Sequence, residues 1–157
     1  MKKSIFLVLL SIVMIGCKSS TPVTSTKVDN KSERAIKGNY VLTSVSYPGS
    51  EYIKVSSFDI ADSKCFIGSK WKFISNNNKG DFALDNSSCS SFVSGITWYI
   101  NKDGMFVMKI LNETKSKKVK EGYILRVQNL TESSFQLVDV GDVGGKSIDV
   151  VYQFQRN

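Results

Sequence analysis

Few residues in this sequence could do covalent or metal chemistry, and their types restrict what that chemistry can be. The chain contains no histidine, which excludes Ser-His and Cys-His nucleophiles and histidine-bound zinc. Asp139 and Asp149 could approach each other across the last predicted hairpin, but surface carboxylates are the simpler interpretation. GDVGGK (Gly141–Lys146) lacks the serine or threonine and the following helix that a phosphate loop needs, so it predicts a turn. We therefore expect no enzymatic activity, no cofactor and no metal site.

The three cysteines carry the remaining reactive chemistry. Cys17 stands where an apolar run, Ser4–Ile15, gives way to lysine and serine. Such a run is shorter than the roughly 20 apolar residues that span a bilayer, and it fits the apolar region of an export signal. Cys65 and Cys89 remain as an even pair, which in an oxidising compartment predicts one disulfide. Its loop would stabilise the fold by about 3–4 kcal/mol in the chain-entropy model. Two free thiols that never meet are the alternative.

The residues around the first cysteine resemble the lipobox of bacterial lipoproteins, in the form Met14-Ile15-Gly16-Cys17. The resemblance implies a signal peptide over residues 1–16, cleavage after Gly16, diacylation of the Cys17 thiol and acylation of the new amino terminus. Several buried acyl chains make a stable anchor, at about 0.8 kcal/mol per CH₂. The competing interpretation is an ordinary signal peptide with an incidental cysteine. Lys18 replaces the aspartate that retains some lipoproteins at the inner membrane, so the resemblance favours the outer membrane, with the domain on either its periplasmic or its surface face.

The segment KSSTPVTSTKVDNKSERA (Lys18–Ala35) has no aromatic residue and few apolar ones. Such a composition cannot bury enough surface to order itself, so it predicts a flexible tether over residues 17–36 with a mean span of about 20–25 Å. A single domain over residues 37–157 follows. The net charge of +7 is ordinary for solubility, and we expect no nucleic-acid partner.

From Gly38 onward the pattern is β almost throughout. Eight runs are rich in β-branched and aromatic residues and are bounded by Gly, Asn, Asp or Ser. The predicted strands are Gly38–Ser46, Gly68–Ser75, Gly80–Asn86, Gly95–Asn101, Gly104–Asn112, Gly122–Asn129, Ser134–Val140 and Ser147–Gln155. The links between most of them read as short turns, including the Asp-Gly type before Gly104.

Alternation within these runs gives each strand one apolar and one polar face, which is typical of antiparallel sheets. In the last run, for example, Ile148, Val150, Tyr152 and Phe154 share one face. Eight such strands with short sequential links predict an all-β fold, an eight-stranded antiparallel up-and-down barrel, because closure removes both sheet edges. A two-sheet sandwich is the competitor, but its crossings need longer links.

Two links are longer than a hairpin needs. Tyr47–Ile67 is about twenty residues long, and a link of that length in a compact domain is usually functional. It fits equally a flap that plugs the barrel mouth and a ligand gate, and Phe58–Ala61 within it predicts one short helical turn. Glu113–Glu121 holds four lysines, which suit a solvated hairpin tip better than a site for phosphate or acidic lipid.

Gly38-Asn39-Tyr40 and Arg156 carry a further resemblance. With the lipobox, the tether and the eight strands, the chain from Gly38 to Arg156 resembles the lipocalin-like domains of bacterial lipoproteins. Tyr40 takes the place of the family's tryptophan at the start of the first strand, and Arg156 that of the arginine that packs across this ring. The resemblance implies a Tyr40–Arg156 pair that closes the barrel and a long flap at the open end.

An eight-stranded barrel is either filled by side chains or holds one small ligand. The residues facing the predicted interior include many aromatics, which suit an apolar or flat ligand, with Trp N–H and Tyr O–H groups to orient it. The candidate ligand-binding residues are Trp71, Phe73, Trp98, Phe106, Tyr123 and Tyr152, and Phe82, Phe135 and Phe154 share their interior faces. The same residues equally suit a packed core.

Three function classes follow from these features. The first is a membrane-anchored carrier or sensor that binds a small hydrophobic ligand in the barrel. The second is a filled barrel that acts through its outer surface as a structural or protein-binding module of the cell envelope. An enzyme that uses carboxylates or tyrosines is the least supported.

Overall fold

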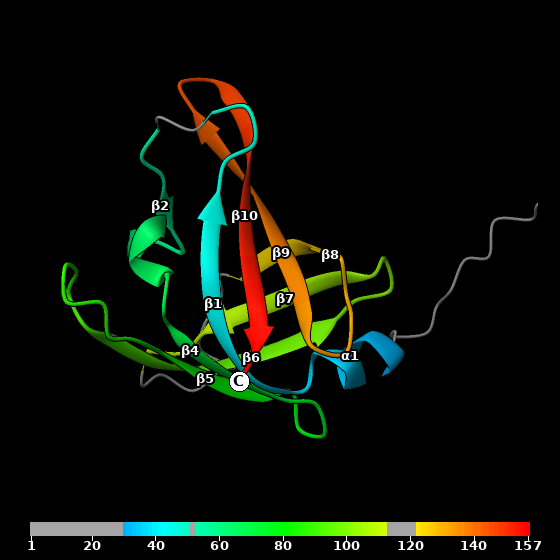
Figure 1. Ribbon diagram of the computed structural model, residues 1–157. Helices are drawn as coiled ribbons and strands as arrows, with labels where there is room; N and C mark the ends of the chain where they lie inside the picture. Colours follow the sequence, from blue (N-terminus) through cyan, green and yellow to red (C-terminus); the bar gives the residue numbers. More distant parts are fainter. Residues whose placement is uncertain (1–29, 51–52, 113–121) are drawn as a thin grey trace, which may run out of the picture.

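The computed structural model describes residues 30–50, 53–112 and 122–157. Eight antiparallel strands in this part of the chain form a closed barrel in the order β1-β10-β9-β8-β7-β6-β5-β4 (Figure 1). The strands are β1 (Gly38–Ser46), β4 (Lys70–Ile74), β5 (Lys79–Leu84), β6 (Phe92–Ile100), β7 (Met105–Ile110), β8 (Tyr123–Gln128), β9 (Ser134–Val143) and β10 (Lys146–Arg156). The predicted up-and-down barrel is confirmed, and the alternative of two stacked sheets is wrong.

The barrel closes because β1 pairs on both of its edges. Tyr40 of β1 lies opposite Trp71 of β4 on one side and opposite Arg156 of β10 on the other. The other strands each pair with their neighbours in the sequence. In the turn before β7, Gly104 takes φ +74, a conformation that glycine adopts without the steric cost of a Cβ.

Aromatic side chains fill the middle of the barrel. Trp71 stacks on Phe82 with 4.3 Å between ring centroids, and Phe135 stacks on Phe154 at 4.8 Å. Phe73 contacts Trp71 and Trp98, and Trp98 stacks on Phe106. All of these rings are almost completely buried. Aromatic pairs of this kind add about 0.5–1.5 kcal/mol each beyond the surface they bury. The predicted interior faces of the strands are therefore the faces that form the core.

A short helix, α1 (Asn30–Ile36), covers one end of the barrel (Figure 1). The Glu33 side chain is 7% exposed, and its Oε1 accepts hydrogen bonds from the backbone N–H of Ile100 at 2.9 Å and from Asn78 Nδ2 at 3.4 Å. Ile36 is completely buried. The prediction of a tether that continues to residue 36 is thus wrong for these seven residues. Their order comes from contacts with distant strands, which local composition does not report.

The long link after β1 covers the opposite end of the barrel. Its described residues 53–67, which we call the plug, contain a two-stranded sheet of β2 (Ser56–Ser57) and β3 (Ala61–Asp62). The 3-10 helix η1 (Ser63–Phe66) follows, with the Asp62 side chain accepting a hydrogen bond from the Lys64 N–H. The helical turn predicted at Phe58–Ala61 is wrong: the helical turn lies two residues beyond it, where Asp62 caps it.

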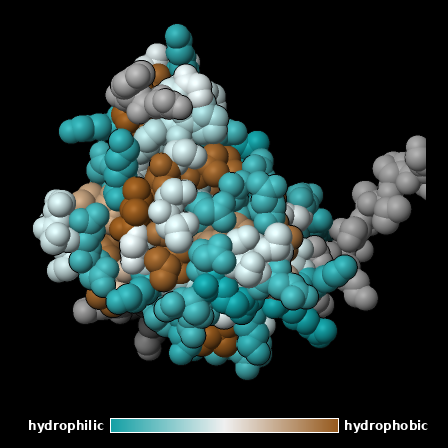
Figure 2. Space-filling model, viewed as in Figure 1, coloured by the Kyte–Doolittle hydropathy of each residue, from teal (hydrophilic) through white to brown (hydrophobic). Residues whose placement is uncertain are grey.

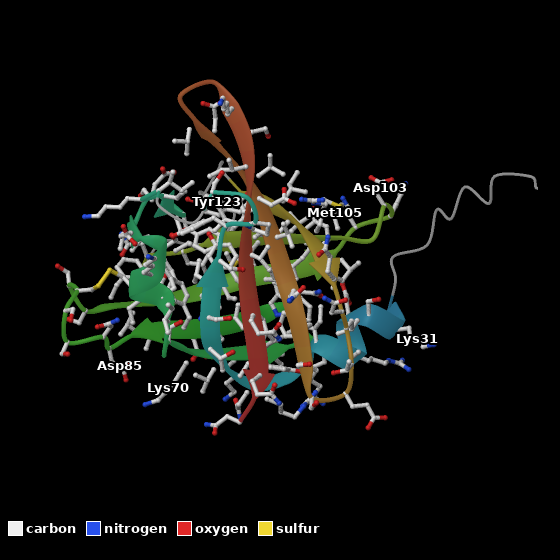
Figure 3. The ribbon with its side chains drawn as sticks, turned by 45° about the horizontal axis from the view of Figure 1, so that its top comes forward. Lys31, Lys70, Asp85, Asp103, Met105 and Tyr123 are labelled. Carbon is white, nitrogen blue, oxygen red and sulfur yellow. A yellow bond between two sulfur atoms is a disulfide. The ribbon has the colours of Figure 1, made fainter. Side chains whose placement is uncertain are left out.

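The predicted disulfide is confirmed. It joins Cys65 of η1 to Cys89 in the link between β5 and β6, with 5.8 Å between the Cα atoms. Figure 3 shows it as a yellow bond at the rim of the barrel. The bond ties the plug to the link between β5 and β6. Among the described residues, no helix combines the length and the apolarity that crossing a membrane requires.

We expect Glu33→Ala to lower the free energy of unfolding by about 1–3 kcal/mol, because the buried Ile100 N–H loses its acceptor. Glu33→Gln keeps an acceptor oxygen at this position and should cost less. Urea denaturation of both variants measures the difference, with Glu132→Ala on the exposed β8–β9 turn as control. Equal stability of Glu33→Ala and the control would contradict the structural role of Glu33.

Candidate functional site

Four of the six candidate ligand-binding residues lie in the packed interior. The Trp71, Phe73, Trp98 and Phe106 side chains are 3% exposed or less, and each ring contacts another of the four. The indole N–H groups have partners within the protein: Trp71 donates to Ser69 Oγ at 2.7 Å, and Trp98 donates to the Lys79 carbonyl at 2.9 Å. These four residues therefore fill the barrel, as the core-filling alternative expects.

The other two candidates, Tyr123 and Tyr152, meet at the plug end around a residue that sequence analysis did not select. Phe58 of the plug lies edge-on to Tyr123 at 5.0 Å and stacks on Tyr152 at 5.3 Å between ring centroids. Phe58 lies in an irregular link, where no periodicity marks a side chain as inward-facing. The one feature of the sequence that could have marked Phe58 is that it is an aromatic residue among serines and aspartates.

A cleft of about 350 Å³ lies beside Phe58, between the plug and the inner wall of the barrel. Its volume falls in the range of small-molecule sites, which are usually apolar with a few polar groups. The lining residues are Phe58, Asp59 and Ile60 from the plug, Phe92 from β6, Ile110 and Asn112 from the end of β7, and Tyr123 from β8. Figure 3 labels Tyr123 at this end of the barrel.

The turn of the plug over this cleft has an unusual backbone. Phe58 and Asp59 have φ values of 55° and 54°, a left-handed conformation that costs a bulky residue about 1–3 kcal/mol. Three contacts offset this cost. A 2.5 Å hydrogen bond joins Ser57 Oγ to the Tyr152 hydroxyl, the Tyr123 hydroxyl donates to Asp59 Oδ2 at 3.4 Å, and the Phe58 ring packs against both tyrosines.

Buried polar groups lie behind the plug. Burial raises the pKa of Tyr152, and the nearby Asp139 carboxylate raises it further, while the hydrogen bond with Ser57 acts in the opposite direction. Tyr152 therefore keeps its proton at neutral pH, and its hydroxyl joins β10 to the plug through the hydrogen bond with Ser57. Burial also raises the pKa of Asp139, while the hydrogen bond that its carboxylate accepts from the Val140 N–H lowers this pKa. A further hydrogen bond joins Tyr47 to Ser63 of η1.

Asp139 and Asp149 do not form a pair. Asp139 lies opposite Val150, and Asp149 lies opposite Val140, so the two carboxylates are on opposite faces of the β9–β10 hairpin. Asp149 instead forms an ion pair with Arg126 on the outer surface. Within the described residues, no group of three or more acidic or cysteine side chains converges in a way that could hold a metal ion.

At the α1 end, Arg156 connects the two chain termini of the domain. Its guanidinium lies 5.0 Å from the centre of the Tyr40 ring, and Nη2 donates to the Tyr40 hydroxyl at 2.7 Å. The guanidinium also donates to three backbone carbonyls: Nε to Glu132, Nη1 to Lys37 and Nη2 to Ala35. Gly38 is required here, because it has φ +142 and a Cβ at this position would lie 2.4 Å from Arg156 Nη1.

No protein-family model and no curated protein matches the sequence. Cys17, the signal peptide over residues 1–16 and the lysine-rich segment Glu113–Glu121 lie outside the described residues. The lipid anchor and the character of that segment therefore stay predictions. The candidate site formed by inward-facing residues is the cleft under the plug.

Arg156→Ala should lower the free energy of unfolding by about 1–3 kcal/mol, because it removes a cation–π contact and hydrogen bonds from a charged donor. Arg156→Lys keeps the positive charge near the Tyr40 ring but not the planar fork, so its loss should be intermediate. Chemical denaturation measures both, with Lys37→Ala as the control for a charge removed nearby. Equal free energies of unfolding for Arg156→Ala and Lys37→Ala would contradict the structural role of Arg156.

Asp139→Asn should stabilise the protein at pH 7. The folded state raises the pKa of Asp139 above its ordinary value of 3.8, so ionising this side chain costs more in the folded protein than in the unfolded chain. The cost appears as the pH rises through the ordinary value toward the folded value, and it is fully present above both. Melting temperatures at pH 7 and pH 3 should therefore show an advantage of Asp139→Asn that disappears at the lower pH. The exposed Asp103→Asn is the control, and a pH-independent difference would contradict the assignment.

Proposed function

We propose that this protein is a non-enzymatic, lipid-anchored binding protein of the cell envelope whose barrel holds a small hydrophobic ligand, as a carrier or a sensor. The observation that carries the proposal is the cleft of about 350 Å³ under the plug. There, inward-facing side chains of β6, β7 and β8 border open space.

The lining of the cleft supports a ligand that is mainly apolar. Phe58, Ile60, Phe92, Ile110 and Tyr123 supply apolar surface, and Asp59 and Asn112 add polar groups. Apolar walls with a few fixed polar groups give affinity through burial and orientation through hydrogen bonds. Because the aromatic core fills the middle of the barrel, the ligand must be small and must stay at the plug end.

The plug fits the role of a gate better than that of a fixed cover. Its tip combines two strained residues, Phe58 and Asp59, with one short hydrogen bond from Ser57 to β10. Moving the tip as a unit would break its side-chain contacts with Tyr123 and Tyr152. The Cys65–Cys89 disulfide would keep the rest of the plug attached during this movement.

The anchor that the sequence predicts would leave the ligand site facing away from the membrane. The chain enters the barrel through α1, at the end opposite to the plug (Figure 1). The connection from Cys17 to α1 has thirteen residues, Cys17–Asp29, and a random-coil chain of this length has a mean span of about 18–22 Å. A ligand would then exchange with the aqueous space or with another envelope protein, and the outer membrane is the location that Lys18 favours.

The proposal is tested by native mass spectrometry of the purified protein after incubation with an envelope extract. We expect a captured small apolar molecule in the unaltered protein. Ile110→Trp should reduce the captured fraction at least tenfold, because the larger ring occupies the cleft that Ile110 lines. Val93→Trp, on the outer surface where Val93 is 70% exposed, is the matched control. Melting temperatures show that both variants are folded.

A protein that stays empty in every preparation would contradict this function and favour the second candidate, a filled barrel that binds a protein partner. A row of apolar residues on the outer surface supports this second candidate: Tyr99 pairs with Val107, which pairs with Ile124. Tyr99 and Ile124 are 45% and 60% exposed. Figure 2 shows the face that carries β1 and β10, where apolar side chains also gather between hydrophilic ones.

A further inference from the structure

The charges around the cleft indicate which kind of ligand it accepts. Three of its lining residues are aromatic: Phe58, Phe92 and Tyr123. The one charged residue in the described lining is Asp59, an acid. No lysine or arginine of the described residues lines the cleft. The described lining thus offers a negative charge and three rings.

The Asp59 carboxylate lies beside the Tyr123 hydroxyl. The left-handed backbone at Phe58 and Asp59 turns the tip of the plug over the cleft. The Tyr123 hydroxyl donates to Asp59 Oδ2 at 3.4 Å, and the Tyr123 ring lies edge-on to the Phe58 ring at 5.0 Å. The carboxylate and two ring systems therefore meet at the same side of the cleft.

A second acid adds to the negative potential at this end of the barrel. Asp139 faces the interior, and its charge acts on Tyr152, whose ring stacks on Phe58. Its burial without a described cationic partner raises its pKa. An ammonium group between aromatic faces and a carboxylate gains from both, through the ring quadrupoles and through the opposite charge. A carboxylate-bearing ligand would be repelled.

We propose that the ligand of this cleft is a small aromatic or otherwise apolar molecule with a cationic amine. This inference rests on the proposed function, since it assumes that the cleft binds a ligand. It commits to the ligand's charge, which the architecture of a barrel does not specify. The rings Phe58, Phe92 and Tyr123 would hold the apolar body, and Asp59 would hold the ammonium group at the mouth of the cleft.

The test compares two probes with the same ring and opposite charges, naphthylmethylammonium and naphthalenecarboxylate. Isothermal titration calorimetry on the purified protein should show the ammonium probe binding about five- to tenfold more tightly, a factor typical of one exposed ion pair together with one cation–π contact. Asp59→Asn should remove this preference and leave weak binding of both probes. Asp81→Asn, an exposed acid on the outer face of β5, is the matched control and should leave the preference unchanged.

A salt titration on the unaltered protein gives an independent readout, because it needs no variant to fold. Raising the ionic strength should reduce the preference for the ammonium probe, since screening weakens interactions of exposed charges. Equal binding of both probes, or tighter binding of the carboxylate, would overturn the charge assignment while the ligand-binding function stands. Absence of binding by either probe, together with an empty protein in native mass spectrometry, would overturn both.

Discussion

The pairing of β1 with both β4 and β10 is the constraint on which the rest of the structure depends. An antiparallel meander of eight strands has two open edges unless its first strand reaches its last. Here Tyr40 lies beside Trp71 on one neighbour and beside Arg156 on the other. Gly38 admits the Arg156 guanidinium, and this guanidinium also donates to the carbonyls of Ala35 in α1 and of Lys37 after it. Closure, the C-terminus and the helix at the α1 end are therefore held by one cluster of contacts.

Closure of a barrel of this size leaves an interior that side chains nearly fill. The large rings carried by β4, β5, β6, β7, β9 and β10 fill the middle of this space, and α1 covers one end with Ile36 and Glu33. At the plug end a cleft of about 350 Å³ remains, because the plug is an irregular segment that packs through a few side chains. The location of the candidate site follows from this packing.

The chemistry of the site follows from what the plug brings to it. Phe58 contributes an aromatic face that bridges Tyr123 and Tyr152, and Asp59 contributes a carboxylate at the rim. The strained conformation of this dipeptide persists because contacts from β8 and β10 hold it. The proposed ligand site would take its specificity from a few polar groups, and a small movement of one turn would change access to it.

Local patterns in the sequence determined the strands, their inward faces, the order of the barrel and the disulfide, because alternation and turn residues report directly on local structure and on its exposed edges. They did not determine three features that depend on distant contacts. Asn30–Ile36 is polar in composition, yet it is helical because Glu33 meets the backbone of β6. β1 shifts its register between Leu42 and Ser44, so that the residues after the shift change faces. Of the candidate ligand residues, only Tyr123 lines the cleft, and Trp71, Phe73, Trp98 and Phe106 serve as core. An apolar residue on an inward face can either contact a ligand or pack against another side chain, and only the tertiary structure decides which, because that depends on how the strands across the barrel fill the remaining space.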